Sequence, residues 1–95
     1  MRITWSRQAV DDLAEVHDYI SRDDTGPANT VVARIVSLIE TRLPAAPHMG
    51  RPGRVAGTRE LVVPGTPFIV PYRVRSGEIE IVRVYHGARR WPSSF

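Results

Sequence analysis

Five side chains in the second half of the chain have the types that acid–base chemistry on RNA would need: Arg59, Glu60, Arg83, Tyr85 and His86. Cleavage through a 2′-hydroxyl needs a base that takes its proton and an acid that protonates the leaving oxygen. It also needs cations that stabilise the charged phosphorane. Because these five groups could supply an acid–base set, the sequence allows a nuclease as one interpretation.

Each of these side chains also has an ordinary structural explanation. Arg59 and Glu60 are neighbours, so in a strand they point to opposite faces and could be charges at a strand edge. Arg83 lies among Ile and Val and could pair with either glutamate of its own strand. His86 follows an apolar strand and could be a structural histidine. Both interpretations stay open at this point.

Metal chemistry is not indicated by the sequence. The chain has no cysteine, and its three histidines, His17, His48 and His86, follow no ligand spacing and have no nearby acid pairs. We therefore expect no metal and no cofactor.

The distribution of arginine suggests a charged partner. All thirteen basic residues are Arg, whose planar guanidinium makes bidentate contacts to phosphate or carboxylate. Residues 1–48 have a formal charge of −2 and residues 49–95 one of +5. A genome that favours Arg codons would explain the residue type, but not this asymmetry. We expect the arginines of the second half to form a cationic docking face for an acidic or polyanionic partner.

The segment HGARRWP near the C-terminus combines charge with a large aromatic residue. Arg and Trp are residue types that dominate binding hot spots. We expect this segment and the preceding strand to bind a target through Arg83, His86, Arg89, Arg90 and Trp91.

Two stretches show helical periodicity. From Arg7 to about Arg22 apolar residues recur at steps of three or four, and Ser6 is a suitable N-cap. A second stripe follows Pro27, which suits a first helical turn, and Pro44 stops it. Because the break is short, we expect an antiparallel helical hairpin. The inward positions are Ala9, Leu13, Val16 and Ile20 in the first helix, and Val31, Ile35, Leu38 and Ile39 in the second.

Four segments have strand composition: residues 2–5, 58–63, 67–74 and 78–86. Short turns join the last three, which favours hairpins. The expected fold class is α+β: an N-terminal strand, the helical hairpin and then a three-stranded antiparallel sheet, in the order β-α-α-β-β-β. The length suits one domain, residues 1–95.

Pro71 falls inside a predicted strand. Because proline cannot donate to a strand ladder, it indicates a sheet edge or a bulge. In the last strand, the two-residue period places Arg83 and Tyr85 on the face of Ile81. Both faces of that strand carry apolar residues, so we expect the helices to cover one side of the sheet. The C-terminal tail, or a partner, would cover the other.

The chain resembles the ParE branch of the RelE/ParE toxin superfamily of bacterial toxin–antitoxin modules. The resemblance rests on ITWS..A..DL..V.DYI, GRPGRVAGTRELVV, TPFIVPYRV and IVRVYHGARRWP. These motifs follow one another over nearly the whole length at the usual spacing. The combination of GTRELVV, TPFIV.Y and RV.HGAR.WP is specific, whereas each element alone is common.

The resemblance implies a toxin that a cognate antitoxin of the ParD type neutralises by laying an apolar helix into a groove. ParE members inhibit DNA gyrase, whereas RelE members cut mRNA on the ribosome. RelE-type toxins place an arginine in the middle strand where this chain has Ile69, and the chain also lacks their C-terminal tyrosine motif. The resemblance therefore favours a gyrase inhibitor. A ribosome-dependent mRNA endonuclease and a non-toxic binding module are the alternatives.

We expect the antitoxin to bind the outer surface of the helical hairpin and a sheet edge, through Tyr19, Val32 and Pro71. The first residues contain no secretory signal, and no apolar run could span a bilayer. We therefore expect a cytoplasmic protein with no membrane partner and no small-molecule substrate.

Overall fold

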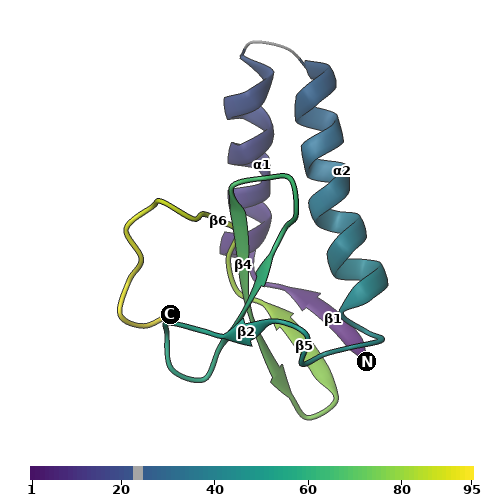
Figure 1. Ribbon diagram of the computed structural model, residues 1–95, viewed down its shortest axis with the longest axis vertical. Coiled ribbons are helices and arrows are strands. Elements are labelled where there is room, and N and C mark those ends of the chain that lie inside the picture. The colour runs from purple at the N-terminus through teal and green to yellow at the C-terminus, as the bar shows by residue number, and fades with distance from the viewer. Residues whose placement is uncertain (23–24) are drawn as a thin grey trace.

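The computed structural model describes residues 1–22 and 25–95. Two helices lie side by side, and the sheet packs against them (Figure 1). The elements are β1 (Arg2–Trp5), α1 (Arg7–Ser21), α2 (Thr25–Arg42), β2 (Arg51–Pro52), β3 (Arg59–Val62), β4 (Phe68–Arg75), β5 (Glu78–Ile81) and β6 (Tyr85–His86).

The sheet is mixed, with the strand order β1-β5-β4-β3-β2, and β6 pairs with β4. β1 runs parallel to β5, and the other pairs are antiparallel. The α+β class and the helical hairpin are therefore confirmed. The predicted three-stranded sheet was too small, because β1 joins its edge, β2 extends the other end and the strand predicted at 78–86 is interrupted.

The sequence signals at the helix ends act as predicted. The Ser6 hydroxyl caps α1 by accepting a hydrogen bond from the Ala9 amide at 3.0 Å. Pro27 lies in the first turn of α2, where a missing N–H costs nothing. The second helix ends at Arg42, two residues before Pro44.

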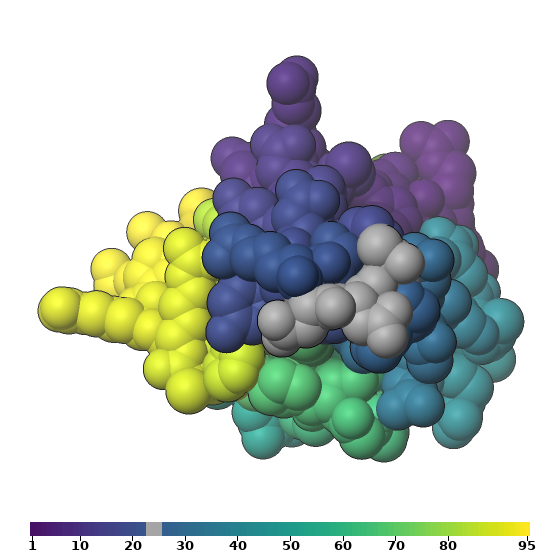
Figure 2. Space-filling model, turned by 90° about the horizontal axis from the view of Figure 1, so that it is seen from above, coloured from purple at the N-terminus to yellow at the C-terminus, as the bar shows by residue number. Residues whose placement is uncertain are grey.

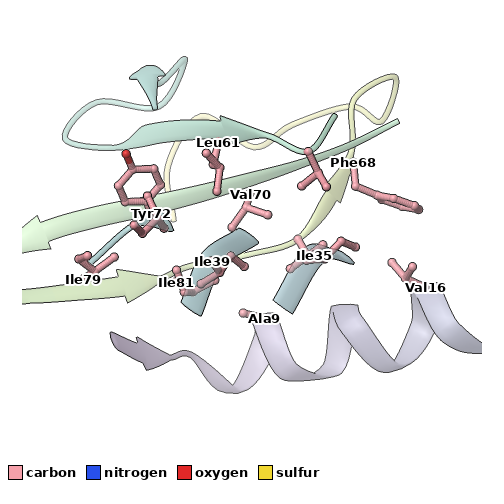
Figure 3. Close-up of a cluster of buried hydrophobic side chains, with 13 residues drawn as sticks. Ala9, Val16, Ile35, Ile39, Leu61, Phe68, Val70, Tyr72, Ile79 and Ile81 are labelled. Carbon is pink, nitrogen blue, oxygen red and sulfur yellow. The ribbon is translucent and has the colours of Figure 1, made fainter. Parts of the chain in front are cut away.

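The core lies between the helices and one face of the sheet. Figure 3 shows side chains from both helices pointing at those of the central strands. Tyr72 is fully buried there, and its hydroxyl donates to the Pro47 carbonyl at 2.8 Å while accepting from the Gly50 amide. The helical part of this core is Ala9, Val16, Ile35 and Ile39, and the strand part includes Leu61, Val70, Ile79 and Ile81.

A β-bulge separates β5 from β6. The amides of Val82 and Arg83 both donate to the Pro71 carbonyl, at 3.0 and 3.4 Å. The bulge that Pro71 predicted is therefore present. The predicted edge location is wrong, because β4 lies between β3 and β5 and the Pro71 side chain is fully buried.

The bulge reverses the faces of the residues that follow it. Val84 joins the core with Ile81, whereas Tyr85 pairs with Ile69 and lies on the sheet face that the helices do not cover, called here the outer face. The prediction that Arg83 and Tyr85 share a face with Ile81 is wrong, because the extra residue breaks the two-residue period.

Candidate functional site

Arg83 is held by a buried carboxylate of α1. Its Nε and Nη2 atoms contact the two carboxylate oxygens of Asp12 at 2.7 and 2.9 Å, and the Val84 amide donates to the same group at 3.0 Å. The hydrogen bond to Asp12 outweighs burial and raises the pKa of Arg83. The alternative in which Arg83 pairs with a glutamate of its own strand is therefore excluded.

Asp12 was not among the residues singled out from the sequence, although the sequence contains a signal for it. It lies three residues after Ala9 and four before Val16, so it belongs to the inward stripe of α1. A carboxylate on that stripe must find a cationic or N–H partner. The signal shows that a partner is needed but does not identify Arg83.

Tyr85 lies at the centre of a cluster of cations and rings on the outer face. The guanidinium groups of Arg83 and Arg89 each lie 4.6 Å from the centre of its ring. Trp91 meets the same ring edge-on at 5.0 Å, and Phe95 lies 6.1 Å away. The C-terminal tail therefore folds back onto the outer face, and Tyr85 is only 2% exposed.

Arg54 connects this cluster to a second buried carboxylate. Its guanidinium lies 3.8 Å from the centre of the Trp91 ring, and its Nε atom contacts Glu60 at 3.1 Å. The Arg54 amide donates to Glu60 at 2.8 Å, and Arg51 contacts the other carboxylate oxygen at 3.0 Å. Burial favours the neutral acid, but these hydrogen bonds outweigh it, so the pKa of Glu60 lies below its ordinary value.

Arg59 lies on the opposite face of the sheet from Glu60. It is on the helix-side face of β3, and it donates to the carbonyls of His48 and Gly50 at 3.2 and 2.8 Å. His86 packs edge-on against Phe68, with ring centres 5.8 Å apart. The five acid–base candidates therefore do not converge on one centre.

The arginines of the second half are also less available than their number suggested. Arg51, Arg54, Arg73 and Arg83 all form ion pairs with carboxylates of this chain. The predicted cationic face is therefore smaller than expected. In the second half, the arginines without a carboxylate or carbonyl partner among the described residues are Arg75, Arg89 and Arg90.

A cleft of about 670 Å³ lies between the C-terminal tail and the outer face of the sheet. The tail forms one flank of the molecule, beside α1 (Figure 2). Four of the five predicted target-binding residues line this cleft; the exception is His86, which faces a different cleft. The lining includes Arg73, Glu80, Arg83, Arg89, Arg90 and Trp91.

That second cleft is mainly apolar, has a volume of about 490 Å³ and lies between α1 and the turn after β3. Tyr19 lies at its rim and is 69% exposed. Val32 does not line it but packs, partly buried, against the core. Pro71 is buried in β4, so the structure contradicts its assignment to an antitoxin-binding edge. The apolar lining includes Val16, Tyr19, Ile20, Val31, Phe68 and Val84.

Two further features are absent from residues 1–22 and 25–95. Within that part of the chain, no group of three or more His, Asp or Glu side chains could hold a metal ion. None of the described helices is long and apolar enough to cross a membrane.

Known proteins are similar to this chain in sequence or in fold. A family model, the ParE toxin of the type II toxin–antitoxin system parDE, matches residues 3–91. "Putative toxin Y4kP" of Sinorhizobium fredii is 44% identical over 91 residues, which cover 96% of this chain and 93% of that protein. "Toxin RelE2" of Caulobacter vibrioides is 33% identical over 88 residues, which cover 93% of this chain and 97% of that protein.

Solved structures show the same architecture. A chain of the chromosomal ParDE TA system from P. aeruginosa superposes with a TM-score of 0.82 at 31% identity, covering 90% of this chain and 95% of that one. YafQ from E. coli shares only the fold, with a TM-score of 0.54 at 20% identity, covering 93% of this chain and 96% of that one. The family match and these relatives establish that the chain belongs to the ParE family of toxins of type II toxin–antitoxin systems.

Proposed function

We propose that this toxin binds and inhibits DNA gyrase in the cytoplasm, that residues 1–95 act as one domain, and that it does not cut RNA. The observation that supports this most is that two of the acid–base candidates, Glu60 and Arg83, already form ion pairs within the chain. Glu60 is 2% exposed between two arginines, and Arg83 is paired with Asp12. Glu60 is therefore not free to take a proton, and Asp12 offsets the charge by which Arg83 would stabilise a phosphorane.

The residues proposed to contact gyrase are those of the tail that remain accessible. Arg89 and Arg90 are exposed and have no carboxylate partner within the described residues. Trp91 lies beside them as a half-buried anchor. Because Arg and Trp dominate interface hot spots, the tail is the proposed contact surface.

The test compares arginines that differ in position but not in exposure. Arg89→Glu or Arg90→Glu should raise the toxin concentration that half-inhibits gyrase supercoiling by roughly tenfold or more. Arg75→Glu makes the same charge change at an exposed arginine outside the cleft, and it should change that concentration less than about twofold.

Wild-type toxin in excess that leaves supercoiling and cleavage complexes unchanged would overturn this proposal. Induction of the toxin without antitoxin then separates the alternatives. Rapid translation arrest with codon-phased mRNA cuts would indicate the RelE-like endonuclease. Normal growth would indicate a non-toxic binding module.

The toxin's partner is an antitoxin, as in the family. We propose that a ParD-type antitoxin lays an apolar segment into the second cleft, with Tyr19 at the rim. Among the residues first considered, Tyr19 is suited to this role because it is exposed, whereas Val32 contributes to the core and Pro71 is buried.

Tyr19→Asp should weaken binding of the cognate antitoxin by roughly tenfold or more, measured by isothermal titration calorimetry. Val10→Asp is the matched control, because Val10 is 53% exposed on the same helix but does not line the cleft. Equal losses in the two variants would refute this location.

A further inference from the structure

Trp91, a residue of the tail cleft, has a buried hydrogen-bond donor without an acceptor among the described residues. The indole Nε1 of Trp91 is shielded from solvent and has no hydrogen-bond partner in residues 1–22 and 25–95. Its ring is fixed on two sides, by the Arg54 guanidinium at 3.8 Å and by the edge of Tyr85 at 5.0 Å. Trp91 is therefore held in the cleft wall by its ring contacts and not by a hydrogen bond of its indole.

The charged groups that line the cleft are mostly cations. Arg89 and Arg90 line it and have no carboxylate partner among the described residues. Glu80 is the carboxylate of the described lining, and Arg73 engages it at 3.2 Å. The cleft therefore favours a ligand that supplies several acceptors and negative charge.

Aromatic rings in the same cleft narrow the class of ligand. Trp91 and Phe95 line it, and both are partly exposed. A carboxylate side chain would satisfy the donors alone, whereas a nucleotide has both an anionic phosphate and a flat base. Aromatic side chains combined with cationic groups are typical of sites that bind single-stranded nucleic acids. The volume of about 670 Å³ is in the usual range for ligand sites, about 300 to 1,000 Å³.

We propose that the tail cleft binds single-stranded nucleic acid. Phosphate oxygens accept hydrogen bonds from Arg89 and Arg90, and a base lies against the exposed part of Phe95. This binding goes beyond the proposed inhibition of gyrase and does not depend on it.

The first test measures fluorescence anisotropy of a short labelled oligothymidylate with the whole toxin alone, over a range of salt concentrations. Wild-type toxin should bind, with affinity that falls as salt rises. Arg89→Gln or Arg90→Gln should weaken binding at least about fivefold and reduce the slope of log affinity against log salt by roughly 0.7. Arg75→Gln removes the same charge outside the cleft and should change affinity less than about twofold.

The second test isolates the aromatic ring of Phe95. Phe95→Leu keeps an apolar side chain but removes the flat ring on which a base would stack, and it should weaken binding at least about fivefold. A thermal melt of each variant checks that it is folded. A folded Phe95→Leu variant that binds like wild type would overturn the proposed role of the ring.

Three results would overturn the proposal as a whole. These are no binding by wild type, equal weakening by Arg75→Gln, and equal displacement of the oligonucleotide by polyglutamate at matched charge, which would indicate a site for acidic polypeptides. Gyrase is absent from these measurements. A wild-type toxin that inhibits gyrase but does not bind the oligonucleotide would therefore refute this inference only. A wild-type toxin that binds the oligonucleotide but does not inhibit gyrase would refute only the proposed function.

Discussion

At the residue scale, Asp12 shows how a buried charge is accommodated on an apolar helix face. It is 5% exposed, and both of its oxygens accept hydrogen bonds from Arg83. One of them also accepts from the Val84 amide. A buried carboxylate is tolerated only with such partners, and removing one member leaves the other charge uncompensated. Asp12 therefore fixes both Arg83 and the residues that follow the bulge.

Asp12→Ala should lower the free energy of unfolding by about 3 kcal/mol, because Arg83 and the Val84 amide lose their acceptor. Urea denaturation at neutral pH measures the change. Asp11→Ala is the matched control, because that neighbouring carboxylate is exposed and should cost less than about 0.5 kcal/mol. Similar losses for the two variants would show that the Asp12 pair does not stabilise the fold.

The sequence identified the candidate residues more successfully than their partners. Arg83, Tyr85 and Trp91 do meet at one site. The partner of Arg83 is 71 positions away, and no periodicity within either segment relates the two. Glu60 has its partners within the same half of the chain, but only the folded loop brings Arg54 to it. Charge counts therefore overestimated the free cations.

At the element scale, the start of α1 is tied to the bulge between β5 and β6. The Ser6 amide donates to the Ile81 carbonyl at 2.9 Å, and its hydroxyl donates to the Val82 carbonyl at 2.7 Å. Pro71 lies opposite the bulge and has no N–H that could donate to the Val82 carbonyl. Ser6 therefore replaces a missing strand hydrogen bond while it also caps the helix.

Ser6→Ala should lower the free energy of unfolding by about 2 kcal/mol, since it removes a helix cap and leaves a carbonyl without its donor. Urea denaturation measures the change. In Ser21→Ala, the control, the lost hydroxyl donates to the Asp18 carbonyl on an exposed part of α1, and the expected loss is below about 0.5 kcal/mol. A Ser6 variant as stable as wild type would contradict the double role.

Local signals predicted the helices and the outer limits of the strands well. The stripes of α1 and α2, the Ser6 cap and the position of Pro27 are properties of short segments. The parallel pairing of β1 with β5 and the break after Ile81 depend on residues from other segments. Pro71 indicated that a bulge was possible, but its position became visible only in the paired strands.

At the scale of the whole molecule, the two faces of the sheet are covered in different ways. The helical hairpin packs on one face over a continuous apolar core (Figures 1 and 3). On the outer face the C-terminal tail is held by rings and cations: Trp91 lies between Arg54 and Tyr85, and Arg54 is fixed by Glu60. The position of the tail therefore depends on a few contacts that single substitutions can remove.

Arg54→Ala should release Trp91, because cation–π contacts contribute only about 0.5 to 2 kcal/mol and few other contacts hold the tail. In a Trp5→Phe background, where Trp91 is the single tryptophan, acrylamide should then quench its fluorescence more strongly than in the parent. Arg51→Ala is the matched control: it also removes a cation from Glu60 but does not contact Trp91, so its quenching should equal the parent's. If both variants quench alike, loss of charge at Glu60 releases the tail, and the stack of Arg54 on Trp91 does not hold it.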